Sequence, residues 1–150
     1  MKEDQKEVYF KNVYDNIKNF GYHTTAVMES QNFTPFTYST GIFENLQIPE
    51  LFISGLGPNL SGELIKNYAE KYKFQNVPLN KKIDDLTDRF PVYFIKVKIQ
   101  DLTDYTLTSF KFYGDRDYEY IQLVFPDLNG RFPNERNYNY DQKIIGNLDI

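Results

Sequence analysis

Hydrophobic side chains follow the spacing of a β-strand in some segments of this chain and the spacing of a helix in others, in no regular order. Residues 93–99 and 118–125 place apolar side chains at every second position, as in a half-buried β-strand. Residues 2–19 and 59–73 place them three or four positions apart, as on one face of a helix. The mixture predicts the α+β fold class, with about five strands in a mainly antiparallel or mixed sheet and three helices on one of its faces.

Turn-forming residues define the other expected elements. A short third helix is expected to end near Phe112, and the further expected strands cover residues 22–29, 36–43 and 51–56. Only a short loop, residues 31–35, separates the first two of these strands, so they are predicted to form an antiparallel hairpin. The chain shows no internal repeat and no linker, which predicts a single domain over residues 1–150 with a polar tail over 134–150.

Charge and composition exclude several chemistries. A net charge of -4 and a pI near 5.0 argue against binding of duplex nucleic acid, which requires clustered cations. The sequence contains no cysteine and a single histidine, so disulfides, thiol nucleophiles, thiolate zinc sites and histidine-rich metal sites are excluded. We therefore expect neither a bound metal nor a cofactor.

The charge and hydropathy of the N-terminal segment bear on location. Residues 1–7 are mostly charged and do not resemble a signal peptide. No apolar run in the sequence approaches the length of a membrane-spanning helix. These features predict a soluble cytoplasmic protein that has no membrane partner.

Tyrosine is the abundant residue that best suits a binding surface. The chain holds 13 Tyr and 13 Phe but no Trp, and a tyrosine ring combines flat apolar area with a polar tip. Residues 37–40 carry hydroxyl groups at four consecutive positions, so both faces of that strand offer donors; the alternative is a half-exposed strand of good β propensity. On this basis the candidates to line a ligand site are Tyr22, Tyr38, Thr40, Tyr118 and Tyr120.

The segment Pro126–Pro133 combines a turn, a glycine, a cation and an aromatic ring directly after a strand pattern. Asp127 suits the first position of a turn, and Gly130 suits a positive φ angle. The turn would then present the guanidinium group of Arg131 to a phosphate or carboxylate, with the Phe132 ring beside it. The structural alternative pairs Arg131 with Asp127 or with a chain terminus.

His23 is the only side chain whose ordinary pKa lies near neutral pH, so it is the candidate general acid or base if the protein is an enzyme. The alternative is a structural histidine at a junction between a helix and a strand. No serine lies in a Gly-x-Ser-x-Gly elbow, and no spacing supports a catalytic triad. The pattern therefore favours binding over catalysis.

Three blocks of sequence carry a family resemblance. They are residues 20–23 (Phe-Gly-Tyr-His), residues 35–42 with 49–56, and residues 122–133, which end in Pro-Asp-Leu-Asn-Gly-Arg-Phe-Pro. Their order and spacing resemble bacterial domain-of-unknown-function family 4262 from about residue 8 to residue 133. The chain departs from the family at Tyr22, where tryptophan is expected, and its tail lacks an aromatic residue expected soon after Pro133. The resemblance implies a small soluble bacterial or phage protein with no established activity.

Three functional hypotheses follow. The first is a non-catalytic binding protein for a small anionic or nucleotide-like ligand, in bacterial or phage defence. The second is a protein-interaction or toxin-immunity domain with a basic protein partner, which the acidic charge balance suits. The third is a small hydrolase that uses His23 as a general base and Arg131 to hold an anion. A cavity where His23, Tyr38 and Arg131 converge would support the first and third hypotheses.

Overall fold

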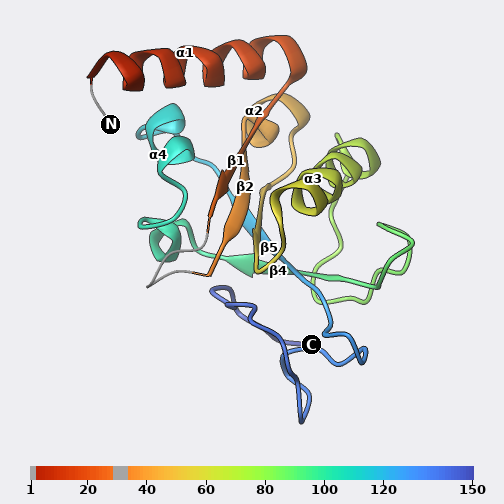
Figure 1. Ribbon diagram of the computed structural model, residues 1–150. Helices are drawn as coiled ribbons and strands as arrows, with labels where there is room; N and C mark the ends of the chain where they lie inside the picture. The colour runs from red at the N-terminus through yellow and green to blue at the C-terminus, as the bar shows by residue number, and fades with distance from the viewer. Residues whose placement is uncertain (1–2, 29–33) are drawn as a thin grey trace.

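The computed structural model describes residues 3–28 and 34–150 (Figure 1). The predicted helix start at Lys2, the end of the predicted strand at Glu29 and the loop residues 31–33 lie outside the described residues. Within the described ranges, no helix is both long and apolar enough to cross a membrane. The elements in chain order are α1 (Glu3–Phe20), β1 (His23–Val27), β2 (Phe36–Thr40), α2 (Ile42–Leu46), β3 (Glu50–Ser54), α3 (Pro58–Tyr72), β4 (Tyr93–Val97), the 3-10 helix η1 (Ile99–Leu102), α4 (Leu107–Tyr113) and β5 (Tyr120–Val124).

The five strands form one mixed sheet in the order β1-β2-β3-β5-β4. β1 and β2 pair antiparallel, with His23 opposite Thr40 and Val27 opposite Phe36, which confirms the predicted antiparallel pairing. β3 and β5 pair in parallel, whereas the other neighbours are antiparallel. The predicted α+β fold class with a mixed five-stranded sheet is confirmed.

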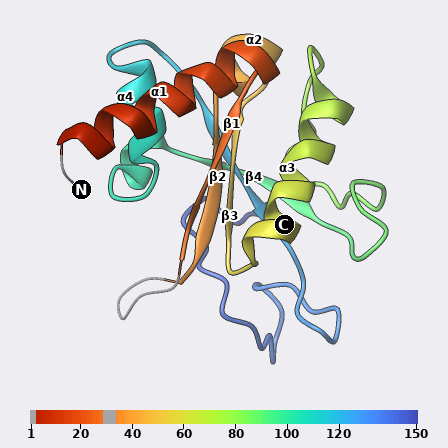
Figure 2. The same ribbon diagram turned by 45° about the horizontal axis from the view of Figure 1, so that its top comes forward.

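The helices cover both faces of the sheet, so the prediction that they share one face is wrong. α3 packs on one face and α4 on the other (Figure 2). The reason lies in the central strands, because β2, β3 and β5 are buried at every position and leave neither face to solvent. α1 lies on the α4 side, where the Tyr9 hydroxyl is 3.0 Å from the Thr108 hydroxyl.

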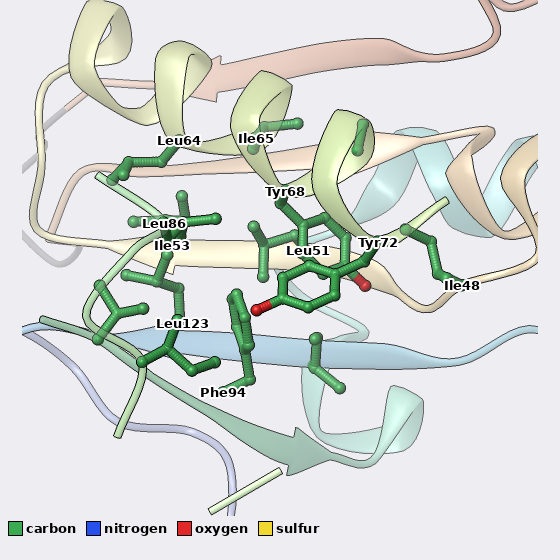
Figure 3. Close-up of a cluster of buried hydrophobic side chains, with 14 of the residues drawn as sticks. Ile48, Leu51, Ile53, Leu64, Ile65, Tyr68, Tyr72, Leu86, Phe94 and Leu123 are labelled. Atoms are coloured by element: carbon green, nitrogen blue, oxygen red, sulfur yellow. The ribbon is translucent and has the colours of Figure 1, made fainter. Parts of the chain in front are cut away.

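The α3 side holds the larger apolar core (Figure 3). The rings of Tyr68 and Tyr72 from α3 lie 5.3 and 5.7 Å, between ring centroids, from the ring of Phe94 in β4. Leu51 and Leu123 reach the same cluster from the middle of the sheet. Aromatic pairs at these distances add to the free energy gained by burial, so this packing stabilises the α3 side of the sheet.

Helix α2 replaces the end of a predicted strand. The sequence pattern predicts a strand as far as Phe43, but the chain leaves β2 at Gly41, whose φ angle is +107°. A side chain there would be strained by the left-handed conformation, and its Cβ would lie 3.0 Å from Ile17 Cγ2. Glycine therefore permits the turn from β2 into α2 beneath α1.

The polar tail is part of the domain. Gln142 accepts a hydrogen bond from the Phe125 backbone N–H and donates one to the Phe125 carbonyl, at 3.1 and 2.8 Å. The Asn147 backbone N–H donates to the Lys96 carbonyl at 3.0 Å. These bonds hold the tail against the ends of β5 and β4 (Figure 1).

Candidate functional site

The structure separates the residues that the sequence groups into one site. His23 pairs with Thr40 at the end of the sheet where β3 and β5 begin. Arg131 follows β5, and the ring of the next residue, Phe132, packs against Tyr93, which pairs with Val124 at the opposite end of the sheet. His23, Tyr38 and Arg131 therefore do not converge on one cavity.

Most of the proposed ligand-binding rings lie in the interior. A buried ring cannot stack against a ligand without local rearrangement. The buried side chains and their exposed fractions are Tyr38 (2%), Thr40 (0%), Tyr118 (6%), Tyr120 (1%) and Phe132 (5%).

Tyr22 and His23 do line an open hollow of about 550 Å³, together with Asn16, Phe20 and Thr24. The Asn16 side-chain nitrogen lies 3.0 Å from Nδ1 of His23, so an amide, and not a carboxylate, orients the ring. Burial lowers the pKa of His23 below its ordinary value. The hollow thus presents a neutral imidazole at pH 7.

Because His23 is the only histidine, its titration can be read directly. We expect a folded-state pKa below about 6.5, measured from the imidazole proton signals by NMR. The unfolded chain then binds the proton more tightly, so His23 should make stability fall as the pH drops below about 6.5. His23→Gln should remove that part of the pH dependence of the melting temperature. A folded-state pKa at or above the unfolded value would contradict the assignment.

The Asp127 carboxylate organises the turn that carries Arg131. Its Oδ1 accepts hydrogen bonds from the backbone N–H groups of Asn129 and Arg131, and its Oδ2 accepts one from Asn139, each at 2.9 Å. Burial opposes ionisation, but these bonds and the charge of Arg131 outweigh it and lower the pKa of Asp127. The Arg131 guanidinium donates to the Asn137 carbonyl at 3.3 Å, so both side chains tie the turn to the tail.

Glu50 is the residue that sequence reasoning missed. It begins β3 and is completely buried, and within residues 3–28 and 34–150 no ion pair joins it to a cation. Burial raises the pKa of Glu50, whereas the hydrogen bonds it accepts favour the carboxylate. The only signal in the sequence is a lone carboxylate directly before the apolar run 51–53. Its donors are the backbone N–H groups of Gly41 (2.8 Å), Ile42 (3.2 Å) and Phe43 (3.1 Å) and the hydroxyls of Ser39 (2.6 Å) and Tyr113.

A second set of buried hydroxyls joins the inner face of α4 to the sheet. The Tyr38 hydroxyl accepts a bond from the Thr108 backbone N–H at 3.1 Å. The Ser109 hydroxyl lies 2.5 Å from that of Thr40 and 2.6 Å from that of Tyr120. Tyr38 and Tyr120, two of the tyrosines predicted to bind a ligand, therefore hold α4 in place.

The outer face of α4 is apolar and exposed. Leu107 and Phe110 are 62% and 45% exposed, and their spacing puts them on one side of the helix. Exposed acidic side chains flank α4 in the sequence. They are Asp101 and Asp104 before the helix and Asp115, Asp117 and Glu119 after it. The basic residues of this segment are Lys111 and Arg116, and Arg116 is paired with Glu44 at 2.6 Å.

A groove beside α4 is lined by Lys111 and by residues of α1, and six of its eight lining side chains are charged, three acidic and three basic. Its volume is about 760 Å³, and Phe10 and Tyr14 contribute its aromatic lining. The Lys111 ammonium group lies 4.0 Å above the Phe10 ring and so belongs to the groove. We call the exposed Leu107 and Phe110, together with this groove, the α4 surface.

Comparison with known proteins identifies a family. The model of a family described as a domain of unknown function (DUF4262) matches residues 16–139, which is most of the chain and confirms the family resemblance. No curated protein and no solved structure gave a significant match.

Proposed function

We propose that this chain, which belongs to the DUF4262 family, is a protein-interaction domain that binds a basic partner protein on its α4 surface. The observation that carries the proposal is the exposure of Leu107 and Phe110 on a helix whose other face is bonded to the sheet. Exposed apolar side chains rimmed by polar ones are typical of protein-binding surfaces.

The charge around α4 supports a basic partner. Residues 99–119 contain five acidic and two basic side chains, and in the groove the acidic and basic side chains balance. One of those basic side chains, Arg116, is already paired with Glu44. Opposite charge on a partner would guide association and fix its orientation. A basic toxin neutralised by an immunity protein is one partner of this chemistry.

A small anionic or nucleotide-like ligand receives less support from the geometry. Of the four rings proposed to stack, Tyr38, Tyr118 and Tyr120 are buried, and Tyr22 lines the hollow beside His23. The Arg131 guanidinium is bonded to the backbone of the tail. The hydrolase hypothesis uses His23 as the base and Arg131 to hold an anion, and these two residues lie at opposite ends of the sheet.

The α4 surface can be tested by affinity capture from the source cells with three proteins. They are the wild type, the double variant Leu107→Ser/Phe110→Ser, and the control Leu128→Ser, which alters a residue that is 98% exposed and lies outside α4. We expect a basic protein to be retained by the wild type and the control and lost by the double variant. With that protein purified, the double variant should weaken Kd by about tenfold or more, since interface anchors each contribute more than 1 kcal/mol.

The electrostatic part of the proposal has its own measurement. Kd for the purified partner should rise between about 50 and 200 mM salt, because salt screens attraction between exposed charges. A partner retained equally by the double variant, or one whose surface is acidic, would refute the proposal. Circular dichroism of all three proteins shows whether loss of binding reflects loss of folding.

A further inference from the structure

The two edge strands of the sheet differ in how they are protected. Along β4, the backbone N–H groups of Asn80 and Asn147 donate to the carbonyls of Phe94 and Lys96, at 2.9 and 3.0 Å. Lys96 is exposed on this strand. A covered, lysine-bearing edge discourages the addition of another strand.

β1 has neither kind of protection. Within residues 3–28 and 34–150, no backbone hydrogen bond joins residues 22–28 to any partner other than β2. Residues 19–28 contain no Asp, Glu, Lys, Arg or Pro, in a chain of which 25% is charged. An unpaired, uncharged edge is a template for strand pairing.

The stretch around β1 is also apolar at its surface. Phe20 is 75% exposed, Met28 is 64% exposed and Val27 is 36% exposed. α1 contacts β1 through Tyr9, whose hydroxyl lies 3.3 Å from that of Thr25. The side chains of Thr24 and Ala26, which alternate with Thr25, remain exposed.

We infer that β1 pairs antiparallel with β1 of a second copy of this chain, about a two-fold axis at Thr25. All five residues of the strand would then be paired, with Thr24 opposite Ala26 of the second copy. A second copy fits because a neutral strand meets no like charge when it pairs with itself, whereas the net charge of -4 opposes association through the acidic surfaces. This inference does not rest on the proposed function.

The register can be tested by disulfide trapping, because the chain has no cysteine of its own. Opposed residues of an antiparallel pair have Cα atoms about 4.5–5.5 Å apart, within the range of a disulfide. We expect Thr24→Cys mixed with Ala26→Cys to form a mixed disulfide under mild oxidation. Thr24→Cys mixed with Thr103→Cys, an exposed position outside the sheet, is the control and should cross-link far less.

Sedimentation equilibrium gives an independent readout. The wild type should show a concentration-dependent dimer, and Thr24→Lys/Ala26→Lys should weaken it about tenfold or more by placing lysines opposite one another. Thr103→Lys/Leu128→Lys adds the same charge at exposed sites and should leave the dimer intact. A wild type that stays monomeric to about 1 mM, or equal cross-linking in the trapping control, would overturn the inference.

Discussion

Glu50→Ala is expected to lower the free energy of unfolding by about 3 kcal/mol or more, because several buried donors lose their acceptor and each unsatisfied buried group costs about 1–3 kcal/mol. The variant leaves three backbone N–H groups of the β2–α2 turn without an acceptor inside the protein. It also releases the Tyr113 hydroxyl, which joins α4 to the carboxylate. The chain has no tryptophan, so urea unfolding followed by far-UV circular dichroism gives the difference in the free energy of unfolding.

A matched control lies in α2, whose first backbone N–H groups bind Glu50. Glu44→Ala removes an exposed carboxylate from α2 whose ion pair is with Arg116. Exposed pairs contribute about 0–1 kcal/mol, so this variant should unfold close to the wild type.

Glu50→Gln tests the protonation state of the buried group. Ser39 Oγ accepts from the Leu51 N–H and Tyr113 Oη accepts from the Glu44 N–H, so both hydroxyls have their protons available for Glu50. An ionised carboxylate accepts all of its donors, whereas glutamine would point an NH₂ group at some of them. We expect Glu50→Gln to cost about 1–3 kcal/mol per unsatisfied group. Stability unchanged in Glu50→Gln would mean that Glu50 is protonated in the folded protein.

The regular strands were predictable because their pattern repeats locally. Alternation over 93–99 and 118–125 identified β4 and β5, and the short spacing around Pro35 identified the β1–β2 pair. The placement of helices was not predictable in the same way. Whether a strand is buried on one face or both depends on its neighbours, and the order β1-β2-β3-β5-β4 cannot be read from any one segment.

The candidate site shows the same limit. A tyrosine suits a binding surface and a core equally well, and Tyr38 and Tyr120 became core residues because the hydroxyl of Ser109 and the backbone of Thr108 supply partners for their polar tips. The buried role of Glu50 was not predicted, because a single carboxylate before an apolar strand matches no sequence motif. Its role depends on Gly41 bringing backbone N–H groups to it from another segment.

Gly55→Ala is expected to be the most disruptive change at the other end of the sheet. Gly55 has a φ angle of +92°, and an added Cβ would lie 2.5 Å from the Asp141 carbonyl oxygen. A left-handed alanine and a clash with backbone together cost about 2–4 kcal/mol. The tail would have to shift, because the Tyr140 hydroxyl donates to the Gly55 carbonyl at 2.9 Å and the Lys143 backbone N–H donates to the Ser54 hydroxyl at 3.0 Å.

Hydrogen exchange should locate the effect of Gly55→Ala in the tail. We expect lost protection over residues 138–147, whereas the amides of β2 remain protected, since tail docking and sheet pairing are separate contacts. The matched control is Gly62→Ala in α3, where no atom lies within 4 Å of the added Cβ. That variant should gain about 0.5–1 kcal/mol, because alanine suits a helix better than glycine. Equal stability of the two variants would show that the tail does not press on Gly55, and that the positive φ angle there carries no structural cost.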